Sequence, residues 1–113
     1  MKHDWGDYLS DILQSIAEVR TFTRGMTYKS FAKDRKTVNA VIRSLEVMGE
    51  AAKRIPDEVR TNHPEIPWKR MAGVRDKLIH EYAGVDLEMV WDVAQEELPP
   101  LKPLLEKLKD ELE

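Results

Sequence analysis

Apolar residues recur every three or four positions along most of this 113-residue chain, and this spacing limits the possible folds more than any other feature. The side chains on one face of an α-helix repeat about every 3.6 residues, whereas those on one face of a strand alternate in pairs. Few short runs favour strands, and we find no internal repeat or low-complexity segment. The pattern therefore predicts an all-α protein.

Five stretches carry the helical pattern. The expected helices run from Asp4 to about Phe22, from Arg35 to Arg54, from Pro67 to the sequence AGVD, from Leu87 to the two prolines at 99 and 100, and from Leu101 to Leu108. Two shorter helical segments are expected near Tyr28 and after Pro56. The loops are short, which favours antiparallel neighbours. We expect an antiparallel bundle of four to five main helices, formed by residues 1–113 as a single domain.

Residues that begin or end helices stand at the edges of these stretches. Side chains that accept backbone hydrogen bonds favour N-caps, glycine favours the position after a helix, and proline favours the first helical position. The expected N-caps are Asp4, Thr27, Asp34 and Asp86; the expected C-caps are Gly25 and Gly84; the expected first helical residues are Pro56 and Pro67; and Pro99 and Pro100 should interrupt the last helical stretch.

Composition excludes several classes of function. The chain has no cysteine, so a thiolate nucleophile, a disulfide and thiolate-bound zinc are all excluded. Its three histidines, His3, His63 and His80, are far apart and form no His-x-x-x-His pair, so no metal site or metal cofactor is predicted. No glycine-rich phosphate loop is present. We expect no signal peptide and no membrane-spanning helix, which fits a cytoplasmic protein.

The net charge of −3 bears on nucleic-acid binding. Proteins that hold nucleic acid by bulk electrostatics are normally basic, so any RNA contact here must rest on a local positive site, and DNA binding is not expected. Two other features receive structural interpretations. Glu46 and Glu50 lie one helical turn apart and are expected to pair with Arg43 and Lys53. The helical spacing of the large aromatic residues favours a core position for each; these are Trp5, Tyr8, Trp68 and Trp91.

The stretch VRDKLIHEYAGVD, residues 74–86, carries the strongest candidates for chemistry. Arg75 is a permanent planar cation that suits phosphate oxygens, and His80 can exchange protons near neutral pH. These two groups are sufficient for metal-free RNA cleavage, because the substrate supplies the nucleophile. A base removes the proton of the ribose 2′-hydroxyl, the oxygen attacks phosphorus, and the cation stabilises the transition state.

Helical geometry complicates this interpretation. Arg75 and His80 are five residues apart, which places them about 140° apart around a straight helix. Either the helix loosens near His80, or a second copy of the chain completes the site. From spacing alone, one arginine and one histidine on a helix are more often structural than catalytic.

The octet RDKLIHEY resembles the Arg-x-x-x-x-His-x-Tyr motif of the HepT family of HEPN-domain toxins. Four longer segments resemble the family pattern in the same order: DYLSDILQSI, AVIRSLEVMGEAAKRIP, HPEIPWKRMAGVRDKLIHEYAGVD and VWDVAQEELPPLK. The resemblance implies an all-α HEPN fold that assembles as a homodimer or a higher even oligomer, with the motifs in a cleft at the interface. It also implies a metal-independent endoribonuclease, without cofactors, that acts as the toxin of a type VII toxin–antitoxin module.

The resemblance assigns roles to individual positions. Arg75 and His80 match the catalytic pair, and Asp76 matches a polar position that supports the arginine. Tyr82 matches the tyrosine to which an MntA-type nucleotidyltransferase antitoxin adds AMP, and that addition would block RNA by charge and bulk. Ala83 departs from the pattern, which has an aromatic residue there. The competing hypothesis is a non-catalytic dimeric helical module that binds a nucleotidyltransferase partner or a nucleotide through the same cleft.

Overall fold

The computed structural model describes residues 5–81 and 84–112, and these ranges contain helices and no strands. The helices are α1 (Trp5–Thr23), α2 (Tyr28–Lys33), α3 (Arg35–Arg54), α4 (Asp57–Asn62), α5 (Trp68–His80), α6 (Leu87–Asp92), the π-helical segment η1 (Val93–Glu97) and α7 (Leu101–Leu112). Four of them are long, and the short α6 continues directly into η1. The predicted all-α class is therefore confirmed.

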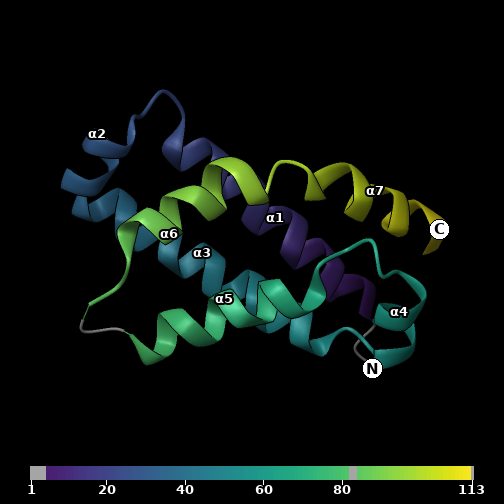
Figure 1. Cartoon of the computed structure of the whole chain (residues 1–113). Coiled ribbons are helices and arrows are strands. Elements are labelled where there is room, and N and C mark those ends of the chain that lie inside the picture. The colour runs from purple at the N-terminus through teal and green to yellow at the C-terminus, as the bar shows by residue number, and fades with distance from the viewer. Residues whose placement is uncertain (1–4, 82–83, 113) are drawn as a thin grey trace.

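The long helices form an antiparallel bundle in which α3 lies between α1 and α5 (Figure 1). Helix α7 packs against the other side of α1, while α2 and α6 lie together at one end of the bundle. The core consists of the apolar stripes that the spacing predicted, such as Leu9 and Ile12 on α1 and Val41 and Leu45 on α3, all fully buried. None of the helices within the described ranges is long and apolar enough to cross a membrane.

Several predicted helix ends are confirmed. Thr27 and Ser30 form a reciprocal capping box at the start of α2, and the carboxylate of Asp34 accepts a hydrogen bond from the backbone N–H of Thr37 at the start of α3. Asp86 caps α6 through Met89 in the same way. The predicted N-cap Asp4 lies outside the described residues.

Glycine and proline end α1 and α3. Gly25 has a φ of 76°, a left-handed conformation that glycine adopts without steric strain. At the end of α3, Ile55 has an extended backbone (φ −68°, ψ 131°) because a residue that precedes proline, here Pro56, is disfavoured in the helical region.

Three local predictions are wrong. We expected Pro56 and Pro67 to be the first helical residues, but each is an N-cap, one residue before its helix begins. Helix α5 ends at His80 with Glu81 as its C-cap, so Gly84 is not the cap; its amide instead donates to the carbonyl of Glu81. Gly84 itself does not adopt the left-handed conformation, and the Glu81 amide closes the last turn of α5 onto the carbonyl of Lys77.

The helical stretch that begins at Leu87 contains a π-turn, whereas we expected a regular helix up to the prolines. Prolines 99 and 100 interrupt it as predicted, but the turn before them is π-helical: the amide of Leu98 donates to the carbonyl of Val93 at 3.0 Å. A π-turn contains one more residue than an α-turn, so it shifts the face of every later residue. Here it turns Leu98 toward the core, where this residue is buried together with Val93 and Ala94.

The aromatic residues divide into two groups. Trp68 is buried, as expected, and its ring N–H donates to the carbonyl of His63 at 3.0 Å. Trp5, Tyr8 and Trp91 are partly buried and pack against the core from its edge. The aromatic residues therefore contribute to the core mostly from its periphery.

Candidate functional site

Helix α5 holds Arg75 against α3. The buried face of α5 consists of Trp68, Met71, Val74 and Leu78, and Arg75 follows Val74 at the border of that face. The side chain of Arg75 is only 26% exposed, which is low for an arginine. Its guanidinium is therefore held by the fold rather than extended into solvent.

The two helices touch most closely at Gly49. A Cβ atom added to this glycine would lie 2.2 Å from the Cβ of Arg75 and 2.8 Å from the carbonyl oxygen of Met71. Both distances are shorter than van der Waals contact, so only glycine fits at this position. Gly49 therefore sets how close the backbone that carries Arg75 comes to α3.

Two carboxylates hold the guanidinium of Arg75. Its Nε lies 3.1 Å from Oε1 of Glu50 on α3, and its Nη1 donates to Oδ1 of Asp76 at 3.2 Å. Each carboxylate has a second cation: Glu50 accepts from Nε of Arg54 at 3.1 Å, and Asp76 accepts from Nζ of Lys53 at 3.2 Å. The five side chains form a chain of alternating charge that links α3 to α5.

These ion pairs shift the pKa values of Asp76 and Arg54. Lys53 lowers the pKa of Asp76 below its usual value, through its hydrogen bond and its positive charge. Arg75 contributes to the same shift, but less. Glu50, and more weakly Tyr8, raises the pKa of the Arg54 guanidinium. Both carboxylates that hold Arg75 are themselves held in place by α3.

This arrangement corrects one prediction. We expected Glu50 to pair with Arg43 or Lys53, but it pairs with Arg54 and Arg75. The expected partner Lys53 instead reaches across to Asp76. Arg75 also contacts Asp76, the residue to which the family resemblance assigns a supporting role.

A groove of about 510 Å³ opens beside Arg75 between α1, α3 and α5. Its polar lining is balanced in charge, with three carboxylates and three guanidiniums, and Val47, Ala51 and Ile79 add apolar surface. The charged residues that line it are Asp11, Arg43, Glu46, Glu50, Arg54 and Arg75. Ile79 is 41% exposed, which leaves an apolar side chain at the rim of a charged groove.

His80 does not line this groove. It is the last residue of α5, its side chain is exposed, and the groove lining ends at Ile79. The helix stays regular through His80, which excludes the alternative in which α5 loosens, and the offset of about 140° from Arg75 remains. Tyr82 and Ala83 lie outside the described residues.

Sequence reasoning missed Gly49 and underestimated Glu50. A glycine inside a long helix costs about 1 kcal/mol relative to alanine, so its presence in α3 was a signal of close helix packing. The Glu50–Arg75 pair left no such signal, because it depends on how two distant helices meet. No group of three or more histidine or carboxylate side chains in residues 5–81 and 84–112 is arranged to hold a metal ion.

Comparison with known proteins identifies the family. Residues 12–108 match a family model described as "Ribonuclease HepT-like". A protein of Thermococcus cleftensis named "Probable ribonuclease HepT" is 49% identical over 109 residues, which cover 96% of this chain and 99% of that protein. A protein of Methanocaldococcus jannaschii named "Putative RNase MJ0127" is 46% identical over 110 residues, which cover 96% of this chain and 91% of the relative. No solved structure matches. This chain belongs to the HepT-like ribonuclease family.

Proposed function

We propose that this protein is a metal-independent endoribonuclease that cleaves RNA by attack of a ribose 2′-hydroxyl. Arg75 and His80 are its catalytic residues, and Asp76 supports Arg75. The proposal rests on how Arg75 is held: its guanidinium is half-buried and is fixed by Glu50 and Asp76 at the edge of a groove. Membership of the HepT-like ribonuclease family supports the same function.

The geometry of Arg75 fits a phosphate ligand. A guanidinium has five N–H donors. Glu50 engages the nitrogen Nε, and Asp76 accepts one N–H of Nη1. Three donors remain for phosphate oxygens, while the two carboxylates prevent the plane from rotating. A fixed donor set of this kind stabilises charge as it develops on the phosphorane, because it needs no reorganisation during the reaction.

The reaction takes place in one step with two proton transfers. His80 accepts the 2′-hydroxyl proton as that oxygen bonds to phosphorus, and water donates a proton to the 5′-oxygen as the P–O5′ bond breaks. The products are a 2′,3′-cyclic phosphate and a 5′-hydroxyl. His80 is the one imidazole that this motif provides, and it does not line the groove beside Arg75, so a second copy of the chain supplies the His80 of each site.

A homodimer therefore completes the proposed site. Within one chain His80 lies outside the groove that contains Arg75, and the exposed Ile79 between them offers an apolar contact for a second copy. A two-fold axis near Ile79 would bring the Arg75 of one protomer toward the His80 of its partner. Each active site would then use side chains from both chains.

The cleavage assay tests this proposal. Purified protein should cleave single-stranded RNA in the presence of a metal chelator and leave 2′,3′-cyclic phosphate ends. Arg75→Ala and His80→Ala should each reduce the rate by about a hundredfold or more while the helical circular dichroism signal is kept. Undiminished cleavage by both variants, or an absolute need for a divalent metal, would refute the assignment.

The proposal extends to regulation through Tyr82. We infer that the protein is the toxin of a toxin–antitoxin module and that a nucleotidyltransferase antitoxin silences it. The Tyr82 phenol oxygen would attack the α-phosphorus of ATP, AMP would be transferred, and pyrophosphate would leave. Mass spectrometry of the chain co-expressed with its neighbouring gene product should show added AMP, which Tyr82→Phe should prevent. Loss of toxicity without any mass increase would contradict this route.

The charge balance of the groove favours one alternative. Three carboxylates opposite three guanidiniums give the groove no net charge, which suits a protein partner better than an RNA strand. On this alternative the chain is a non-catalytic dimeric module that binds a nucleotidyltransferase or a nucleotide. Harmless expression together with tight partner binding would favour the module, whereas toxicity abolished by His80→Ala would favour the enzyme.

A further inference from the structure

A second hollow, of about 760 Å³, lies between α1, η1 and the start of α7, and we propose that it binds a nucleoside phosphate. It is larger than the groove beside Arg75 and falls within the usual size range of small-molecule sites. Asp11 faces the groove and Arg20 faces the hollow; nine residues apart on α1, they point about 180° apart. The two sites are therefore on opposite faces of α1.

The charge of the hollow differs from that of the groove beside Arg75. Its lining includes three cations, Arg20, Arg24 and Lys102, and no carboxylate. The groove beside Arg75 is neutral, and the whole chain has a net charge of −3. None of the three cations forms an ion pair with any residue in the described parts of the chain. Three unpaired cations around one hollow create a local positive potential that favours an anion.

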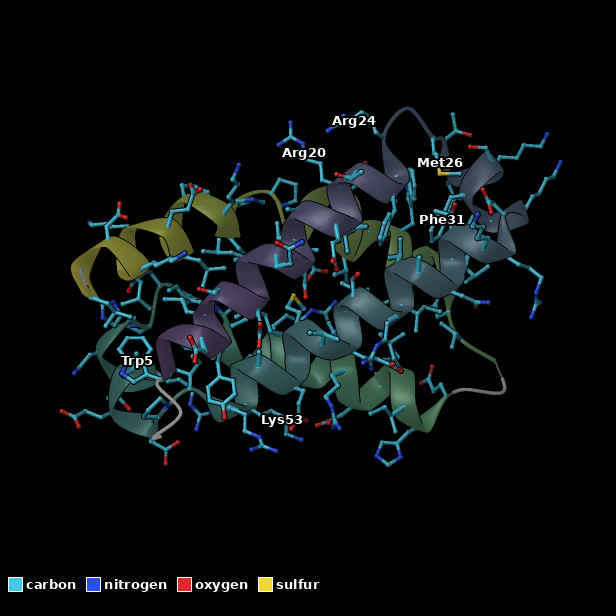
Figure 2. All side chains as sticks on the ribbon, turned by 180° about the vertical axis from the view of Figure 1, so that it is seen from behind. Trp5, Arg20, Arg24, Met26, Phe31 and Lys53 are labelled. Atoms are coloured by element: carbon cyan, nitrogen blue, oxygen red, sulfur yellow. The ribbon has the colours of Figure 1, made fainter. Side chains whose placement is uncertain are left out.

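The cations are placed so that they can act together. Arg20 lies in the last turn of α1 and Arg24 directly follows the end of this helix, and both project from the same side of the molecule (Figure 2). Figure 2 also shows Lys53, from the charge chain around Arg75, at the opposite edge of the molecule. Lys102 comes from α7 on the other side of the hollow. Two guanidiniums from the end of α1 and an ammonium from α7 can bind a phosphate from two directions.

The backbone at this end of α7 cannot replace these side chains. Pro100 has no amide hydrogen, and the amides of Leu101 and Lys102 already donate to the carbonyls of Leu98 and Pro99. Recognition of an anion therefore depends on the side chains, which makes it accessible to mutation.

The floor of the hollow suits the base of a nucleotide. It is apolar, with Ile16, Ala94 and Leu98 buried beneath it. One oriented amide lies at its edge: Nε2 of Gln95 donates to Oγ1 of Thr23 at 3.0 Å, which in turn donates to the carbonyl of Val19 at 2.9 Å. These bonds orient the Gln95 amide and leave its carbonyl oxygen as an acceptor for an exocyclic amino group. A simple anion would use the cations but neither the apolar floor nor this amide.

A nucleoside phosphate could come from two sources. One is a free mononucleotide, and the other is a residue of an RNA strand bound outside the reaction centre. The RNA source rests on the proposed ribonuclease function, and the free nucleotide does not. A binding measurement that involves no cleavage tests this proposal alone. The cleavage assay tests the proposed ribonuclease function, so the two can fail separately.

The test compares two double variants. In Arg20→Ala/Arg24→Ala both guanidiniums are lost from the hollow. In Lys29→Ala/Lys33→Ala two exposed cations, also one turn apart, are lost from α2 outside it. The probes are the four ribonucleoside monophosphates, by calorimetry, and a 2′-O-methylated single strand, by fluorescence anisotropy. The methylated strand resists cleavage because its 2′-oxygen has no proton to lose. Circular dichroism verifies that both variants remain helical.

We expect the intact protein to bind at least one probe, and Arg20→Ala/Arg24→Ala to weaken that binding by about tenfold or more. The lysine variant should bind like the intact protein at moderate salt. Binding of a mononucleotide identifies the free source, and binding of the strand alone identifies RNA. Failure of every probe to bind, equal weakening by both variants, or equal affinity for inorganic pyrophosphate would overturn the proposal. Displacement of the probes by oligoglutamate at equal concentration would assign the hollow to an acidic protein and overturn it as well.

Discussion

The contact between α3 and α5 at Gly49 allows a quantitative prediction. Replacement of Gly49 by alanine would place a Cβ 2.2 Å from the Cβ of Arg75 and 2.8 Å from the carbonyl oxygen of Met71. The first atom must move by more than about 1 Å to regain ordinary contact, and the second is backbone. Neither belongs to the far end of a flexible side chain, so the two helices must separate.

The free energy of unfolding changes through two opposing effects. Overpacking of this severity costs about 3 kcal/mol, the upper end of the usual range. Alanine in place of glycine inside a helix returns about 1 kcal/mol. We therefore expect Gly49→Ala to lower the free energy of unfolding by about 2 kcal/mol, which corresponds to a decrease in Tm of roughly 8 °C for a domain of this size.

Gly73→Ala is the matched control. Gly73 lies inside α5, is exposed, and has no atom within 4 Å of the position that a Cβ would occupy. The same substitution there should raise the free energy of unfolding by about 0.5–1 kcal/mol, because only the helix preference changes. Thermal denaturation followed by circular dichroism measures both variants. If Gly49→Ala is as stable as Gly73→Ala, the close approach that positions Arg75 does not exist and the reasoning is refuted.

Three further predictions concern single contacts. Glu50→Gln should slow RNA cleavage by between about ten- and a hundredfold, since Arg75 loses its ion pair on α3; an unchanged rate would show that Glu50 does not position it. Thr27→Ala removes the capping box of α2 and should lower the free energy of unfolding by about 1 kcal/mol in urea denaturation, a loss that Thr27→Ser should largely avoid. The bidentate pair with Arg70 lowers the pKa of Glu97 below 4.5, so its stabilising effect is present above that pH and lost as the pH falls through the lower, folded-state pKa. Glu97→Gln should therefore be less stable than the intact chain near neutral pH, and the gap should close in acid; a gap independent of pH would contradict the pairing.

The sequence predicted the helices well because their limits depend on neighbouring residues. Helix α3 begins after Asp34 and ends at Arg54, as predicted, since a side-chain cap and a following proline act within a few residues. The π-helical segment η1 could not be predicted in this way. One additional residue in a turn leaves the apolar spacing nearly unchanged, and here it is favoured by the burial of Leu98.

The site was harder to predict than the fold. On α3 the periodicity allowed Glu50 to pair with Lys53 or Arg54, three or four residues away, and local spacing does not choose between them. The structure shows that Lys53 is drawn to Asp76 on α5, which leaves Glu50 to Arg54 and Arg75. Contacts of this kind depend on the packing of helices that are distant in sequence. On the proposed function, the His80 that acts with Arg75 belongs to a second chain, and such a contact leaves no local signal in the sequence.

The central claim is that Arg75 of one protomer acts with His80 of another, and a mixing experiment tests it most directly. Arg75→Ala and His80→Ala, each inactive alone, are unfolded together in denaturant, refolded as a mixture, and assayed for RNA cleavage. A random mixture contains about half heterodimers, each with one intact site of two, so we predict recovery of about a quarter of the activity of the intact protein. If the mixture forms heterodimers but stays inactive, the two residues act within one chain or not at all, and the shared site is wrong.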